Sequence, residues 1–227
     1  MAVRAVGGFE GRIKILRGSE NEEKELKVAD GEEAIFSIPS LAMPAVFVFI
    51  ENGRVVRVTE SSRYVPVPLA NLTAGVNAGD GIYAKAVLSN PAPEAEHPDA
   101  KEIAFTFGKG LASAVARLPE PQFIPGRPVA YGLWVNGDGS GVPMTMRFED
   151  ATGQSFQPAP LPVDWKGWRY VRFSLRGDNV TRFGGANDGI VHLPAKITSP
   201  LILENPNGKG LQGTLRIAGI TVSAETE

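Results

Sequence analysis

The sequence predicts an all-β protein made of two β-sandwich domains, of which the C-terminal one is a jelly roll. Short runs that alternate apolar and polar residues recur along the chain, as in half-buried strands. Glycine and proline are abundant, with 26 and 18 of 227 residues, and are scattered as the many turns of a β protein require. No stretch sustains a helical period of useful length.

The first domain, residues 1–75, is expected to be a small β-sandwich of Ig-like or linker type. Alternating or β-rich runs predict strands at residues 12–16, 25–28, 33–38, 45–50, 54–58 and 64–68. Asn52-Gly53 between two of these runs predicts a hairpin with a type I′ turn. Pro66 and Pro68 make the last run an edge strand, because proline cannot donate to a β-ladder.

The second domain, residues 76–227, is expected to contain about eight short strands separated by long turns, as in a jelly roll. The runs that predict these strands are 82–88, 102–107, 112–118, 130–135, 144–148, 168–175, 200–204 and 214–222. The composition changes to Ala, Gly, Asn, Pro and Glu over residues 71–99, which places the domain junction there. Within that region, residues 90–99 read as an acidic, proline-rich loop.

Charge and composition exclude several classes of function. The formal net charge is −2 and no basic run is present, so we expect no nucleic-acid partner. The longest apolar run, residues 45–50, is far too short to span a bilayer, so we expect no membrane insertion. The absence of cysteine excludes disulfides, thiolate catalysis and cysteine-based zinc sites.

The sequence does not favour an enzyme. His97 and His192 stand alone, without the Ser and Asp motifs of a hydrolytic triad. No phosphate-binding glycine motif is present. Glu149 and Asp150 precede Gly153 and read as part of a turn rather than as a pair that flanks a glycosidic bond. A carbohydrate-active enzyme with an unrecognised carboxylate pair remains an alternative.

Residues 131–175 hold all three tryptophans of the chain and are the main candidate for a binding site. Trp134 lies between Leu133 and Val135, so it points to the opposite face of its strand. The pattern favours a core tryptophan, since large aromatic residues usually pack inside. The alternative is a platform that stacks on a sugar ring.

The strand that follows Trp165 and Trp168 presents two further candidates. Its residues Val171, Phe173 and Leu175 form the better core face, so Tyr170 and Arg172 are expected to point outward. Trp165 lies just outside this strand and is the tryptophan most free to be exposed. Two interpretations stay open: at least one of Trp165 and Tyr170 contacts a ligand, or the tryptophan plugs the end of the sandwich.

Aromatic residues beside polar ones suit a sugar ligand. The C–H face of a pyranose stacks on an aromatic ring, and its hydroxyls need hydrogen-bond partners. The polar candidates are Asn136, Asp138, Arg172 and Arg182.

The stretch 136–141 resembles the front half of a calcium loop, but Arg147 occupies the twelfth position and cannot ligate. The stretch therefore favours a hairpin turn. A structural calcium bound by distant residues stays open, and we expect no other cofactor.

Three strings carry a resemblance to a known type of module: LWVNGDGSG at 133–141, the Asp150, Gly153 and Gln154 that follow Phe148, and DWKGWRY at 164–170. Over residues 102–222 the chain resembles the carbohydrate-binding-module-like, galactose-binding-like jelly rolls of bacterial polysaccharide-active and surface proteins. Related jelly rolls often have a calcium-binding carboxylate near the last strand, but residues 215–222 hold no acidic residue here.

The resemblance implies a non-catalytic accessory domain that binds a polysaccharide or oligosaccharide. It also implies a catalytic domain in the same larger protein, with an extracellular or cell-surface location in a bacterium. The alternative within this class is a bracing β-sandwich of a glycoside hydrolase or lyase that binds no ligand itself.

Overall fold

The computed structural model describes residues 2–4, 8–17, 20–30, 33–35, 46–60, 63–67 and 71–225. Regular secondary structure in these ranges is strand throughout, which confirms the all-β class. The chain forms two compact units, Met1–Val65 and Pro66–Glu227. The sequence places the boundary at 75/76, a position inside strand β8 (Thr73–Ala78), which pairs with β11 (Ala112–Arg117) of the second unit.

The first unit contains two antiparallel sheets. Their strands are β3 (Glu20–Val28), β2 (Phe9–Arg17), β5 (Val46–Glu51) and β6 (Arg54–Glu60) in one sheet, and β1 (Ala2–Arg4) with β4 (Glu33–Ile35) in the other. Asn52 and Gly53 have φ values of 48° and 76°, so the predicted hairpin with positive φ at both positions is confirmed. Strand β7 (Arg63–Pro66) follows. Residues 36–38, 45 and 68 of the predicted strands lie outside the described residues.

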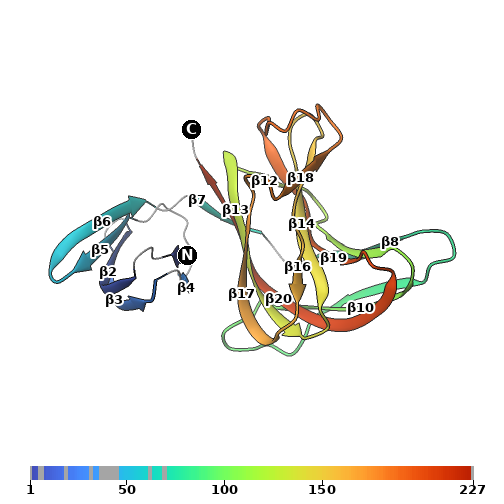
Figure 1. Cartoon of the computed structure of the whole chain (residues 1–227), viewed down its shortest axis with the longest axis horizontal. Helices are drawn as coiled ribbons and strands as arrows, with labels where there is room; N and C mark the ends of the chain where they lie inside the picture. The colour runs from blue at the N-terminus through green and yellow to red at the C-terminus, as the bar shows by residue number, and fades with distance from the viewer. Residues whose placement is uncertain are drawn as a thin grey trace. The chain divides into compact units, whose positions relative to one another are not determined.

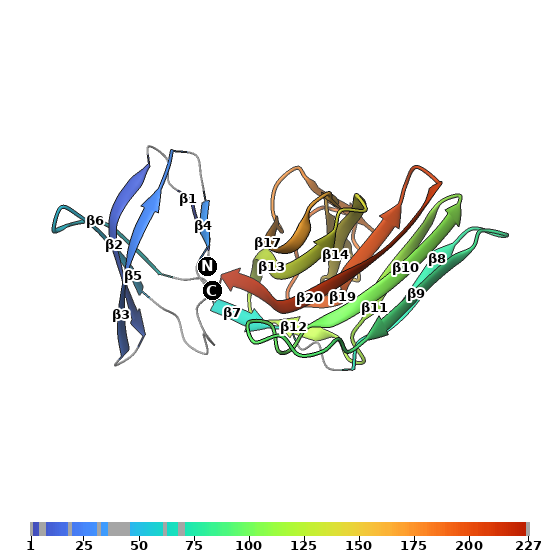
Figure 2. The ribbon, with the colours of Figure 1, turned by 90° about the horizontal axis from the view of Figure 1, so that it is seen from below.

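The second unit is a sandwich of two antiparallel sheets, which lie as separate layers in Figures 1 and 2. The first, named the β13 sheet, has the order β17 (Lys166–Ser174), β13 (Arg127–Asp138), β20 (Lys209–Glu225), β10 (Lys101–Lys109) and β9 (Ala84–Ser89). The second, named the β14 sheet, has the order β18 (Val180–Phe183), β15 (Ser155–Pro158), β14 (Val142–Glu149), β19 (Ala195–Asn205), β11 and β8. Two short strands extend it, β12 (Gln122–Ile124) beside β19 and β16 (Leu161–Val163) beside β14.

The core lies between these two sheets and follows the alternation of the strands. Leu133 and Val135 of β13 are 1% and 0% exposed, and Met144 and Phe148 of β14 are both 0% exposed. The chain passes repeatedly from one sheet to the other, for example from β10 to β11, from β13 to β14 and from β19 to β20. This interleaving agrees with the predicted jelly-roll sandwich.

Candidate functional site

The β13 sheet brings together four of the predicted site residues on its outer face. Trp134 is the direct cross-strand partner of Tyr170, and their rings meet edge to face with centroids 5.4 Å apart. Asn136 pairs with Trp168 on the same side of the sheet, and Arg172 pairs with Gly132. Tyr170 and Arg172 therefore point outward as predicted, since Val171 and Phe173 are buried between the sheets. We call this surface the aromatic face.

Residues 90–100, named the strap, lie across the aromatic face. The strap connects β9 to β10, and its His97 reaches Trp168, with ring centroids 4.0 Å apart, and Trp134, at 5.2 Å. Only 8% of His97 is exposed. The interpretation of His97 as an isolated residue of the proline-rich loop is wrong, because tertiary contacts place it on two tryptophans distant in sequence.

Ionic hydrogen bonds hold the strap in place. The Glu94 carboxylate accepts hydrogen bonds from Trp168 Nε1 at 2.7 Å and from Arg216 at 2.6 Å, and Arg216 also pairs with Glu102 at 3.0 Å. The bonds from Trp168 and Arg216 lower the pKa of Glu94, so it stays ionised. Asp99 accepts a further bond from the backbone N–H of Gly219 at 3.1 Å. Sequence reasoning missed Glu94 and Arg216, because neither lies near the tryptophans in the chain.

Two polar side chains of the aromatic face have no polar partner among the described residues. In the part of the chain that the structure describes, neither Asn136 nor Arg172 makes a side-chain hydrogen bond or ion pair within the protein. Asp138 differs, since its carboxylate accepts bonds from the backbone N–H groups of Ser140 at 2.8 Å and Thr214 at 2.7 Å. Asp138 thus fixes a turn, as the hairpin interpretation requires.

Trp165 and Arg182 lie apart from the aromatic face. Trp165 lies on the opposite side of β13 from Asn136. It packs against Gly137, where a Cβ atom would come within 2.9 Å of Trp165 Nε1, and successive residues of a strand face opposite sides. Trp165 also lies under the Arg169 guanidinium, 5.0 Å from its ring centroid. Arg182 is on β18 of the other sheet, with its guanidinium against Gly189. All three tryptophans are half-buried rather than fully buried.

The outer face of the β14 sheet carries a second set of side chains that the sequence does not single out. Strand register aligns five residues in one row across five strands, in the order Phe123, Lys196, Glu149, Ser155 and Phe183. The two phenylalanines are 59% and 42% exposed, and Lys196 and Glu149 form an ion pair of 2.8 Å between them. Four strand intervals separate the two rings by roughly 19 Å.

A chain of polar side chains runs beside this row. The Arg147 guanidinium lies 5.0 Å from the Phe183 ring centroid and donates to Gln157 at 2.8 Å. Gln157 in turn donates to Glu204 at 2.8 Å. Glu204 lines a hollow of about 390 Å³ together with Leu111, which is 65% exposed. Asn77 and Ser113 also line this hollow and are hydrogen-bonded to each other.

The middle of the outer face of the β14 sheet is covered by neighbouring side chains. Thr145, Ile202 and Val115 are cross-strand neighbours that point outward, yet they are only 1%, 2% and 5% exposed. Their burial on the solvent side means that neighbouring side chains rise above them. We call the whole surface, from Phe123 and Phe183 to the hollow at Leu111, the open face.

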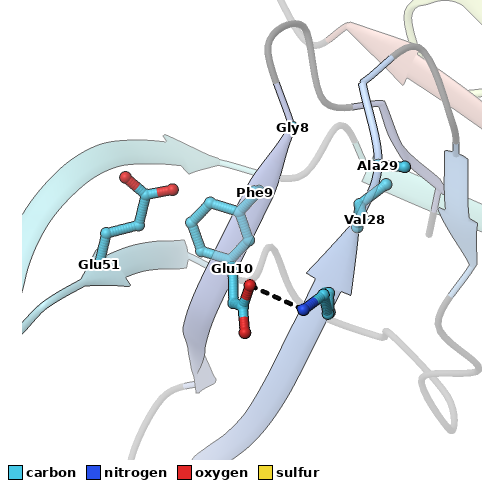
Figure 3. Close-up of a pocket in the computed structure, with 7 residues that line it drawn as sticks. Gly8, Phe9, Glu10, Val28, Ala29 and Glu51 are labelled. Carbon is cyan, nitrogen blue, oxygen red and sulfur yellow. Dashed lines mark ion pairs between the residues drawn. The ribbon is translucent and has the colours of Figure 1, made fainter.

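The first unit has a hollow of its own, of about 510 Å³ (Figure 3), with Phe9, Glu10, Val28 and Glu51 in its lining. The Glu10 carboxylate is 2.9 Å from the Lys27 ammonium, and both side chains are largely exposed.

Asp150 and Asp188 tie two loops of the second unit together. Asp150 is 2% exposed and accepts hydrogen bonds from Thr152, Gln154 and the backbone N–H of His192. These bonds lower its pKa against the opposing effect of burial, which is the largest single influence. The turn predicted around Asp150 is therefore present. Among the described residues, no group of three or more His, Asp or Glu side chains could hold a metal ion.

No helix within the described ranges has the length and apolar character needed to cross a bilayer.

Comparison with known proteins finds remote structural likenesses. No protein-family model matches the chain, and no curated protein matches it. A family 11 carbohydrate-binding module of the cellulosomal cellulase Lic26A-Cel5E of Clostridium thermocellum is 13% identical, with a TM-score of 0.48, over 72% of this chain and 96% of that chain. A family 11 module from the same organism, in complex with a β-1,3-1,4-mixed-linked tetrasaccharide, is 16% identical, with a TM-score of 0.49, over 72% and 97%.

A third solved structure, TmCBM61 in complex with β-1,4-galactotriose, is 17% identical, with a TM-score of 0.35, over 67% of this chain and 88% of that chain. These structures are carbohydrate-binding modules, the class that the sequence resemblance indicates.

Proposed function

We propose that this chain is a carbohydrate-binding module and that its open face holds a polysaccharide or oligosaccharide chain. The row from Phe123 to Phe183 is the observation that carries the proposal. Two exposed aromatic rings at its ends offer flat apolar surfaces, and Lys196, Glu149 and Ser155 between them offer donors and acceptors. A sugar chain needs both kinds of contact, because its rings have C–H faces and its edges carry hydroxyls.

The charges of the open face favour a neutral glycan. Lys196 is paired with Glu149, and the charge of Arg147 is opposed by that of Glu204. Burial lowers the pKa of Arg147, and the Coulomb attraction of Glu204 offsets part of this shift. Balanced charges leave no net field to attract or repel an anionic chain. Binding of this kind is weak to moderate, since hydroxyl groups exchange water for protein at small net gain.

The proposed role is non-catalytic. Among the described residues, the carboxyl groups whose pKa departs from its ordinary value, Glu94, Asp150, Asp188 and Glu225, are all shifted downward. A glycosidase acid needs the opposite shift, so that it keeps a proton near neutral pH. We further propose, from the sequence resemblance, that the chain works beside a catalytic domain in an exported bacterial protein.

Affinity electrophoresis against neutral polysaccharides tests the binding. The panel contains mixed-linkage β-glucan, β-1,4-galactan, xylan and galactomannan. We expect at least one to retard the protein, and we expect Phe123→Ala and Phe183→Ala each to weaken that retardation. Tyr83→Ala is the matched control, because Tyr83 is as exposed as Phe123 but lies outside the row.

Two results would overturn the proposed binding at the open face. If no polysaccharide retards the protein, a bracing sandwich becomes the better description. If the substitutions of Phe123 and Phe183 leave retardation unchanged, the open face is not the binding surface. Release of reducing ends from any member of the panel would overturn the non-catalytic role.

A further inference from the structure

We infer that the aromatic face is a second carbohydrate-binding surface, which the strap holds closed with the His97 ring in the place of a sugar ring. The inference rests on the proposed function, since it assumes that the chain binds glycans. It concerns the β13 sheet, on the other side of the sandwich from the open face.

The contact of His97 shows what the aromatic face accepts. A flat ring lies 4.0 Å from Trp168 and 5.2 Å from Trp134, centroid to centroid, at interplanar angles of 37° and 48°. A small residue forms the sheet surface beside the tryptophans, since Ala218 is the cross-strand partner of Trp134 and is fully buried. The two indoles thus hold a ring against them, and the same apolar surfaces could stack on the C–H face of a pyranose.

The polar groups around this contact are those that a sugar would use. Asn136 and Arg172 flank the tryptophans on the same face and have no hydrogen-bond or ion-pair partner among the described residues. Asn136 is half-buried, so its unpaired amide favours a ligand with donors and acceptors of its own. Asn136, Arg216 and Glu102 are successive cross-strand neighbours and form one row of polar side chains. Arg216 and Glu102 are joined by an ion pair.

The strap is much longer than its connection requires. It joins β9 to β10, which are antiparallel neighbours in one sheet, and two residues can make such a connection. The additional residues instead reach across the sheet to β17, where Trp168 binds Glu94. Most of the strap is exposed, and its described side-chain attachments are those of Asn90, which accepts a hydrogen bond from Lys101 Nζ, and of Glu94, His97 and Asp99. A segment held at few points can leave the face without disturbing the core.

The first experiment opens the strap while the open face is disabled. In a Phe123→Ala/Phe183→Ala background, we add Glu94→Ala and His97→Ala, and compare binding of the retarding polysaccharide by affinity electrophoresis and calorimetry. We expect the opened variant to bind at least tenfold more tightly than the background, and we expect Trp134→Ala to remove that gain. Glu96→Ala is the matched control, because Glu96 is an exposed strap residue without a hydrogen bond or ion pair in the described chain, and it should add no binding.

The second experiment uses the unaltered chain, so it does not depend on the folding of the variants. Hydrogen exchange of the strap amides, including those of His97 and Ala100, is measured with and without saturating polysaccharide. We expect the polysaccharide to speed exchange within residues 90–100. Unchanged or slower exchange would overturn the inference, as would an opened variant that is folded but binds no better than its background.

The outcomes separate this inference from the proposed function. If the unaltered chain binds polysaccharide and opening the strap adds nothing, only the second surface fails. If neither the unaltered chain nor the opened variant binds any member of the panel, both fail. If Phe123→Ala/Phe183→Ala keeps full binding and Trp134→Ala removes it, the aromatic face is the binding surface and the open face is not.

Discussion

The hydroxyl of Tyr131 donates a hydrogen bond of 2.5 Å to the backbone carbonyl of Pro200 and so joins the two sheets inside the core. Tyr131 is 0% exposed, and burial raises its pKa well above the ordinary value. The hydroxyl therefore stays protonated and remains a donor at neutral pH.

Tyr131→Phe should lower the free energy of unfolding of the second unit by about 1–2 kcal/mol, because the Pro200 carbonyl loses its buried partner. Urea unfolding followed by tryptophan fluorescence measures this unit alone, since Trp134, Trp165 and Trp168 all belong to it. Tyr83→Phe, at a 59% exposed position, is the control and should be neutral. Equal stability of both variants would show that the inter-sheet bond contributes nothing.

Gly132 is required by the ring of Tyr170. A Cβ atom at position 132 would lie 2.0 Å from the Tyr170 hydroxyl oxygen, so Gly132→Ala should cost about 1–3 kcal/mol of stability through overpacking. Gly75→Ala, whose nearest neighbour is the Arg117 guanidinium at 3.5 Å, is the matched control. Tyr170→Phe should recover part of the loss. A stable Gly132→Ala variant in urea unfolding would contradict the close contact.

Local patterns predicted the faces of single strands well. Alternation placed Tyr170 and Arg172 opposite Val171 and Phe173, and Asn52-Gly53 marked a hairpin, because both features depend on neighbouring residues only. Six strands of the described chain were missed, β1, β8, β12, β15, β16 and β18. These have three to six residues each, and their pairing with neighbouring strands rather than a pattern of their own defines them.

The candidate surfaces were less predictable, because they depend on register between distant strands. Phe123 and Phe183 share a row only through the pairing of β12, β19, β14, β15 and β18. His97 meets Trp134 through a strap whose path over the sheet has no signature in its own sequence. Sequence alone therefore identified aromatic residues of the aromatic face but neither its cover nor the open face.

Calcium should not be needed for the loops around Asp150. One carboxylate oxygen of Asp150 accepts three hydrogen bonds, from Thr152 N–H, Thr152 Oγ1 and Gln154 N–H, and the other accepts one from His192 N–H. These four bonds use about all of the acceptor capacity of a carboxylate. The melting temperature should therefore be the same in EDTA and in millimolar calcium chloride. A rise of several degrees with calcium, absent with magnesium, would reveal a structural calcium site.

Asp188 makes the stability of these loops fall as the pH is lowered through the acid range. Its carboxylate accepts hydrogen bonds from Ile190 N–H and from the Gln154 amide, and lies 2.8 Å from His192 Nε2. These partners, the Ile190 N–H first, lower its pKa from 3.8 to about 2. Because the folded pKa lies below the unfolded one, the stabilisation is fully present above pH 3.8 and is lost as the pH falls from there through 2.

Asp188→Asn removes this pH-dependent contribution. We therefore compare the melting temperatures of Asp188→Asn and the unaltered chain at pH 5, 4, 3 and 2. The difference in melting temperature should be largest at pH 5, narrow below pH 4 and nearly close at pH 2. Asp178→Asn alters an exposed carboxylate in the same unit that has no partner within the described chain, and its difference from the unaltered chain should be small at every pH. A difference for Asp188→Asn that stays constant from pH 5 to pH 2 would mean that the hydrogen bonds of Asp188 do not favour its ionised form.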